Sequence, residues 1–304
     1  MKYAVSFFNN FRYKDEVDEI IFIYGEKNIG HTEQISSYVN KNQTAILQME
    51  DISNEKFGEA FADLLELKTD LNDNLILMIN FDNKDLIKQL KEFNFKFMFK
   101  DYARSKEMIE AMGAEGACSV YIVEELAFNL KALKYLKEKY NLEYRVFPDI
   151  AQSTKGTGNY IDPLCKFFIR PEDTEVYEEY IDVFEFYHIG EQLSVIYEIY
   201  KKQQWLGDLN DIIIGFPEDK RISNRTIAPH FGQVRVDCNK ICLCGRCYIC
   251  EEISKLADSF GEAGLEIIKK KKKVERTEEE LSSAIEELKE RINESKINEN
   301  VNDN

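Results

Sequence analysis

Apolar runs recur along residues 1–205 and alternate with amphipathic segments. Two of the runs, 20–24 and 75–79, are almost entirely apolar, which is typical of parallel strands that are buried on both faces. Strand-like runs begin near Tyr3, Ile20, Thr44, Leu75, Phe95, Ser119, Tyr144, Lys166 and Val183. Helical patterns lie between most of them, at 32–40, 55–67, 84–93, 105–112, 129–140 and 174–180, and one more follows at 193–200.

This alternation predicts a repeated βα unit, most clearly at residues 95–126. There, two strand-like runs flank a segment in which Met108, Ile109 and Met112 recur at helical spacing. A strand, a helix and a second strand joined in this way form a right-handed crossover between parallel strands. Repetition of the unit over residues 1–205 predicts a (β/α)8 barrel of the TIM type.

The barrel prediction has one strand too many, because the pattern supplies nine candidates. Either the run at Lys166 or the run at Tyr3 is therefore expected outside the ring. An open, doubly wound sheet is the alternative. Its dinucleotide-binding form is disfavoured because no GxGxxG turn follows the first strand.

The βα rhythm stops after Trp205, and the remainder divides into two parts. Residues 206–260 are predicted to form a Cys-rich extension, with a short strand at 212–217 and extended chain at 225–236. Residues 261–304 are predicted to form a charged, helical and partly disordered tail. Apolar residues follow a heptad spacing from Val274 to Ile292. This pattern covers fewer heptads than a coiled-coil prediction requires. The tail is either a solvated segment or a helix that contacts a partner or a second copy.

The extension contains the most specific chemical signal in the chain, five cysteines spaced C-x3-C-x-C-x2-C-x2-C. Thiolates bind zinc and iron–sulfur clusters, and four of them are enough for either. We predict Cys238, Cys242, Cys247 and Cys250 as metal ligands, which leaves Cys244 as a spare. The cofactor is either a [4Fe–4S] cluster or zinc, and a purely structural metal is the simpler interpretation.

Charge and hydropathy limit the classes of partner. The formal net charge is −16 and the sequence pI is about 4.8, which argues against broad nucleic-acid binding but leaves a local RNA site open. No run of 18 apolar residues and no signal peptide is present in the sequence, so we expect a cytoplasmic protein without a membrane partner.

Polar residues where the predicted strands end are candidates for a site, because catalysis in such barrels takes place at the carboxyl ends of the strands. The densest group is 100–104, which supplies Lys100, Asp101 and Arg104. Glu125 follows the next strand. His188 follows the last strand, and its ordinary pKa suits proton transfer. These five residues are the predicted catalytic set, although each taken singly also fits a helix cap or an ion pair in a loop.

Residues 95–130 resemble the middle of the collagenase-like peptidase family U-thirty-two. The similarity lies in 99–102 and 120–126 and returns at 179–186, running into 195–200. It implies a TIM-type barrel over about residues 1–200. Three of the family's motifs differ here: its Arg-Glu-Leu is Glu124-Glu125-Leu126, its His-Gly and cysteine segment is replaced at 148–153, and its Lys-Ile-Glu-Gly-Arg strand end has no counterpart beyond 185–188.

The resemblance implies peptide cleavage, or iron–sulfur-dependent hydroxylation of RNA bases or small molecules. We therefore expect a metal-binding barrel enzyme of the hydroxylating kind, with a small-molecule or RNA substrate. The alternative is a non-catalytic barrel that serves as a binding or assembly module, with structural zinc and a tail that contacts a partner. Peptidase activity is the least supported, because no nucleophile motif is visible.

Overall fold

The computed structural model describes residues 1–237, except 9, 124–125, 128–129, 152–166, 217–220, 228 and 230. Within these residues, nine strands form one sheet in which every pair is parallel. The strands are β1 (Lys2–Ser6), β2 (Glu19–Tyr24), β3 (Thr44–Met49), β4 (Leu75–Ile79), β5 (Lys96–Phe99), β6 (Tyr102–Ala103), β7 (Ser119–Ile122), β8 (Glu143–Val146) and β9 (Val183–Phe186).

The sheet curls into a nearly closed barrel. Its order is β5-β4-β3-β2-β1-β9-β8-β7-β6, and the two strands at its edges, β5 and β6, are consecutive in the chain. The backbone N–H of Cys118, just before β7, donates to the Phe97 carbonyl of β5 at 2.9 Å, and this bond links β5 to the segment that leads into β7, the neighbour of β6. Only residues 100 and 101 separate β5 from β6, so the two ends of the strand order lie next to each other along the chain. The prediction of an α/β barrel is confirmed.

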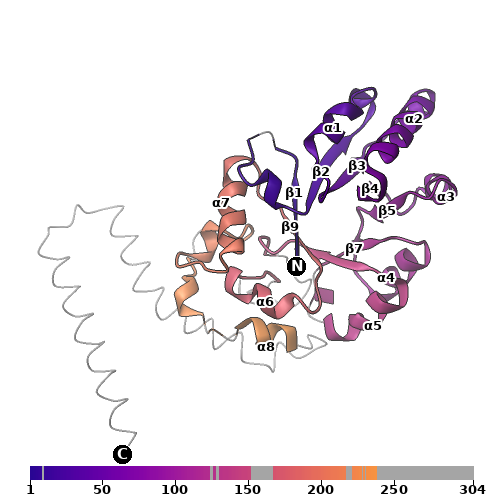
Figure 1. Ribbon diagram of the computed structural model, residues 1–304. Helices are drawn as coiled ribbons and strands as arrows, with labels where there is room; N and C mark the ends of the chain where they lie inside the picture. The colour runs from indigo at the N-terminus through magenta and orange to yellow at the C-terminus, as the bar shows by residue number, and fades with distance from the viewer. Residues whose placement is uncertain are drawn as a thin grey trace, which may run out of the picture. The chain divides into compact units, whose positions relative to one another are not determined.

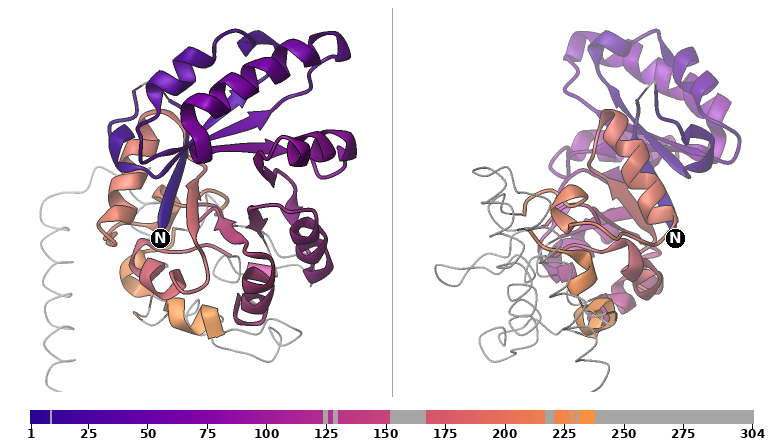
Figure 2. Two further views of the ribbon diagram at one scale, coloured as in Figure 1. Left: turned by 45° about the vertical axis from the view of Figure 1, so that its right-hand side comes forward. Right: turned by 90° about the vertical axis from the view of Figure 1, so that its left-hand side faces the viewer.

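The helices lie outside the strands (Figures 1 and 2). In the described part of the chain they are α1 (Thr32–Tyr38), α2 (Asn54–Leu71), α3 (Lys84–Glu92), α4 (Lys106–Ala114), α5 (Leu130–Tyr140), α6 (Thr174–Tyr177), α7 (Gly190–Lys201) and α8 (Phe231–Asp237). In the described part of the connection from β1 to β2, the chain forms the 3-10 helix η1 (Lys14–Glu16). None of these helices combines the length and apolar character needed to cross a membrane.

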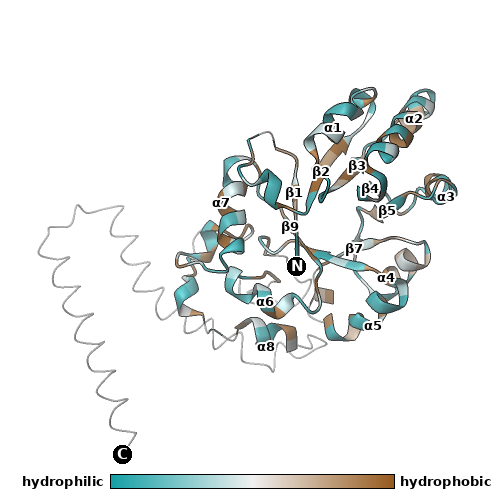
Figure 3. Cartoon of the chain, in the orientation of Figure 1, coloured by the Kyte–Doolittle hydropathy of each residue, from teal (hydrophilic) through white to brown (hydrophobic). Residues whose placement is uncertain are grey.

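Two apolar layers hold the barrel together, because successive side chains of a strand point to opposite faces. The inner layer is small and includes Ile21, Ile46, Ile76 and Met98. The outer layer is larger and lies between the strands and the helices. Accordingly, helices such as α2, α3 and α5 carry both brown and teal in Figure 3, as helices with one face against a sheet do.

Of the two runs that were candidates for a place outside the ring, the run near Tyr3 is β1 and belongs to the ring. Lys166 lies outside the described residues, and residues 168–170, which follow it, form no strand. The short strand predicted at 212–217 is reduced, in the described chain, to one parallel bridge between Ile214 and Ile150. That bridge brings the segment after residue 205 to the end of the barrel.

The extended conformation predicted for 225–236 is wrong, because residues 231–237 form the helix α8. Phe231 and Arg235, one helical turn apart, both contact Phe168. The rings of Phe231 and Phe168 stack with their centroids 5.9 Å apart, and the Arg235 guanidinium lies 4.6 Å from the centre of the Phe168 ring. This contact against the barrel outweighs the strand preference of the valines in the segment.

Candidate functional site

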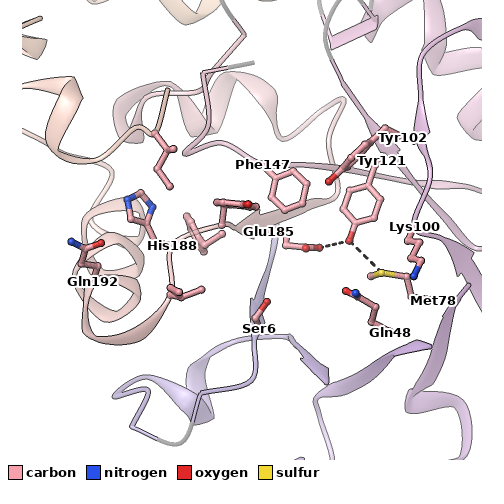
Figure 4. Close-up of a pocket in the computed structure, with 14 residues that line it drawn as sticks. Ser6, Gln48, Met78, Lys100, Tyr102, Tyr121, Phe147, Glu185, His188 and Gln192 are labelled. Atoms are coloured by element: carbon pink, nitrogen blue, oxygen red, sulfur yellow. Dashed lines mark hydrogen bonds between the residues drawn. The ribbon is translucent and has the colours of Figure 1, made fainter. Parts of the chain in front are cut away.

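A cavity of about 530 Å³ opens at the carboxyl ends of the barrel strands. Its walls include Ser6 at the end of β1, Gln48 of β3, Met78 of β4, Tyr121 of β7 and Glu185 of β9. Figure 4 shows these side chains converging from different strands. This is the end of the fold at which the sequence predicted a site, and the cavity is large enough for a small molecule.

His188 lines the cavity and is held by a buried carboxylate. Its ring Nδ1 lies 2.7 Å from Oδ2 of Asp149, a residue that is fully buried. The backbone N–H groups of Tyr187 and His188 also donate to this carboxylate, at 3.0 and 3.2 Å. Because a carboxylate only accepts hydrogen bonds, the contact orients the ring with its Nδ1–H toward Asp149, and in the neutral tautomer Nε2 is the nitrogen with the free lone pair. The arrangement fits an imidazole that is oriented for proton transfer.

Glu185 lines the same cavity and belongs to a buried polar network. Its Oε2 accepts hydrogen bonds from the Tyr121 hydroxyl at 2.8 Å and from Nη1 of Arg145 at 3.1 Å. Arg145 also pairs with Glu19, and both of these side chains are almost completely buried. Burial raises the pKa of Glu185, although the Arg145 charge opposes that shift. One guanidinium therefore contacts two buried carboxyl groups, and the Lys2 ammonium lies 3.8 Å from Glu19 and supplies a second positive charge beside that carboxylate.

One side of the cavity combines a cation with aromatic rings. Lys100 lies there, and its ammonium is 3.4 Å from the carbonyl oxygen of Met49. Tyr121 and Phe147 stack with ring centroids 5.4 Å apart and planes at 6°, while the Tyr102 ring meets Tyr121 edge-on at 5.5 Å. In the view of Figure 4, Glu185 lies between His188 on one side and Tyr121 and Lys100 on the other. This wall suits an anionic group next to a planar one.

The structure brings together two of the five predicted catalytic residues, Lys100 and His188, which line one cavity. The Oδ2 atom of Asp101 accepts the backbone N–H of Phe81 at 2.7 Å and so braces a loop. Arg104 is exposed and does not belong to the cavity lining. Glu125 lies outside the described residues.

The predicted metal ligands Cys238, Cys242, Cys247 and Cys250 also lie outside the described residues. Within residues 1–237 as described, no group of three or more His, Cys, Asp or Glu side chains is placed to hold a metal ion. Cys118 is described, and burial raises the pKa of its thiol to about 12, so it is not a ready thiolate ligand. The [4Fe–4S] or zinc site therefore stays a prediction.

Some of the residues in the site were not chosen from the sequence. Asp149 and Glu185 stand among the polar residues at strand ends, but nothing in the sequence pairs Asp149 with His188 across 39 residues. A signal was available for Glu185, since it is the one charged residue of a short strand whose residues are all buried, and Arg145 is likewise a buried charge between two buried apolar neighbours in β8. Such a charge is retained inside a protein only when it is paired or functional.

No protein-family model, no curated protein and no solved structure matches this chain. The resemblance to the U-thirty-two family therefore stays a prediction that rests on the residues quoted for it.

Proposed function

We propose that this chain is an enzyme that moves protons on a small anionic molecule bound at the mouth of the barrel. One observation carries the proposal: His188, oriented by the buried Asp149, lines the same cavity as Glu185, whose pKa is raised by burial. Two titratable groups held in different environments at one cavity are the usual basis for assigning a base and an acid.

His188 takes the role of the base. Its Nδ1 proton is committed to Asp149, so Nε2 accepts a proton from the substrate. The positive charge that then forms on the imidazole ring is stabilised by the Asp149 carboxylate 2.7 Å away. Asp149 does not touch the substrate in this scheme and acts only through the orientation and charge of His188.

Glu185 takes the role of the acid. Its Oε2 accepts from Tyr121 and Arg145, so the proton of the neutral carboxyl group resides on Oε1. When that proton passes to the substrate, the same two donors stabilise the carboxylate that remains. One proton leaves the substrate at His188 and another arrives from Glu185, so the reaction class is an isomerisation or elimination with no net oxidation.

Lys100 anchors the substrate. Its ammonium lines the cavity beside Tyr102 and Tyr121, and a carboxylate or phosphate of the substrate pairs with it. The positive charge also stabilises negative charge that develops when His188 removes a proton.

The test is an untargeted conversion assay, in which the purified protein is incubated with the small molecules of a cell extract and changes are followed by mass spectrometry. We expect the unmodified protein to consume one or a few anionic compounds. His188→Gln should slow that conversion by about 10²–10⁴-fold, as should Glu185→Gln. Leu206→Ser is the control, because Leu206 is exposed and lies outside the cavity lining.

Two outcomes would contradict the proposal. The first is an equal rate of conversion by His188→Gln and by the unmodified protein, which would remove the base from the scheme. The second is a compound that raises the unfolding temperature of the protein but is never converted. Such a result would make the chain the non-catalytic binding module. The iron–sulfur hydroxylation expected from the family resemblance is a separate proposal, since it depends on cysteines outside the described residues.

A further inference from the structure

A second cavity adjoins the first at the mouth of the barrel. Its volume is about 300 Å³, and it shares two wall residues, Ser6 and Gln48, with the first cavity. It lies between the ends of β1 and β2 and the helix α1, from which Gln34 and Ile35 contribute. The proton-transfer scheme makes no use of this space.

The described lining of this second cavity is apolar and amide-rich. Phe7 and Ile23 supply exposed apolar surface, with 40% and 58% of each residue accessible. The lining includes the amides of Asn28 and Gln34 and the imidazole of His31, and no Asp, Glu, Lys or Arg is found among the residues described there. The first cavity, in contrast, holds Lys100, Glu185 and His188. The two spaces therefore suit different parts of a ligand, one charged and one uncharged.

The apolar wall has a fixed position. The Phe7 ring packs against Phe22 with centroids 5.0 Å apart and meets Tyr38 edge-on at 4.6 Å. The Phe7 backbone N–H also donates to the Ile21 carbonyl at 2.7 Å. A side chain held in this way is already placed for binding, so little conformational entropy is lost when a ligand covers it.

Exposed apolar side chains are concentrated at this end of the barrel. Among the described residues, six of the ten large hydrophobic side chains that are exposed line one cavity or the other. They are Phe7, Ile23, Tyr102, Tyr187, Ile189 and Ile214. Single exposed apolar residues need no explanation, but a group of them around a hollow marks a binding surface.

We propose that the second cavity binds an uncharged, mainly apolar part of the same substrate whose anionic group lies beside Lys100. The inference rests on the proposed function for the position of the anionic group. It narrows the substrate class to small anions that carry an aliphatic or aromatic substituent, with Ser6 and Gln48 next to the point where the two parts join.

The test uses butyrate, hexanoate and octanoate as probes, with dissociation constants measured by NMR titration of the full chain. We expect affinity to rise with chain length, by up to about fourfold for each methylene group that is buried. Ile23→Ser should flatten this dependence while leaving butyrate binding unchanged. Lys100→Gln should weaken all three probes by the same factor.

Leu206→Ser is the matched control, because Leu206 is 56% exposed and Ile23 is 58% exposed, but only Ile23 lines the cavity. An equally steep dependence on chain length in Ile23→Ser and in the unmodified protein would overturn the subsite, as would octanoate binding no more tightly than butyrate. None of these measurements involves turnover, so loss of the acid–base scheme would leave them unaffected. A flattened dependence in Ile23→Ser with no effect of Lys100→Gln would retain the apolar subsite and reject the anion site.

Discussion

Arg145 is the residue on which the interior of the barrel depends most. Its guanidinium is fully buried and contacts both Glu19 and Glu185. Removal of one member of a buried ionic group leaves the other charges without compensation, which costs far more than the loss of an exposed ion pair. The charge at position 145 therefore supports both the fold and the proposed acid.

We predict that Arg145→Met lowers the free energy of unfolding by about 3–5 kcal/mol at neutral pH. Burial already raises the pKa of Glu185, and without the guanidinium that pKa rises further above its value in the unfolded chain. Such a group binds its proton more strongly in the folded state, so stability falls as pH rises through this range. In urea denaturation, the free energy of unfolding of Arg145→Met should lie slightly below that of the unmodified protein at pH 5 and further below it at pH 8.

Lys134→Met serves as the matched control for that experiment. Lys134 pairs with Glu179 at 2.7 Å, and both side chains are largely exposed, so its removal should leave the urea midpoint in place. A deficit in Arg145→Met that is the same at both pH values would show that lost packing, rather than uncompensated charge, is responsible.

Among the helices, α4 and α2 each contain a glycine, and the space around the two glycines differs. Gly113 lies in α4, and a Cβ atom there would stand 2.6 Å from Cγ of Tyr140 in α5. Gly58 lies in α2, where an added Cβ would meet nothing within 4 Å. The first glycine therefore permits close packing of two helices, while the second only weakens its own helix.

These positions predict opposite effects of one substitution. Gly58→Ala should raise the free energy of unfolding by about 0.5–1 kcal/mol, because alanine favours the helix. Gly113→Ala should lower it by about 1–3 kcal/mol, because the backbone of α4 must move away from Tyr140. Thermal unfolding of the two variants measures both. Stabilisation by Gly113→Ala would mean that α4 and α5 are not packed as described.

The helices differ in how well the sequence predicted them. The period of the apolar residues located α2, α3 and α5 to within a few residues, because each of these helices buries one face against the sheet. It was wrong for α8, since the valines there favour a strand and the decisive contact, from Arg235 to Phe168, spans 67 positions along the chain. Local patterns report burial well but say little about which distant ring a side chain will meet.

At the scale of the whole molecule, the sequence predicted the barrel but not every strand in it. The two-residue strand β6 (Tyr102–Ala103) was not among the nine candidates, because so short a segment carries no apolar pattern. Polar residues at strand ends were expected to converge, and Lys100 and His188 do line one cavity. The pairing of His188 with Asp149 could not be predicted, because it depends on how far each loop extends past its strand.

The predicted metal centre belongs to this scale as well, since it concerns the part of the chain after the barrel. We expect protein purified without oxygen to contain either iron with labile sulfide or zinc, in a fixed ratio to the chain. Cys247→Ser combined with Cys250→Ser should abolish that content, because two of the four thiolate ligands are lost. Elemental analysis decides between the metals, and protein that contains neither would remove the prediction.

The central claim is that Asp149 acts through His188 to make a base at the mouth of the barrel. The most direct test is a double-mutant cycle on the conversion found in the extract assay, with His188→Gln, Asp149→Asn and both together. We expect Asp149→Asn alone to slow conversion by about 10²-fold or more, and the double variant to be no slower than His188→Gln alone. Losses that multiply in the double variant would contradict the claim, because Asp149 would then act independently of His188.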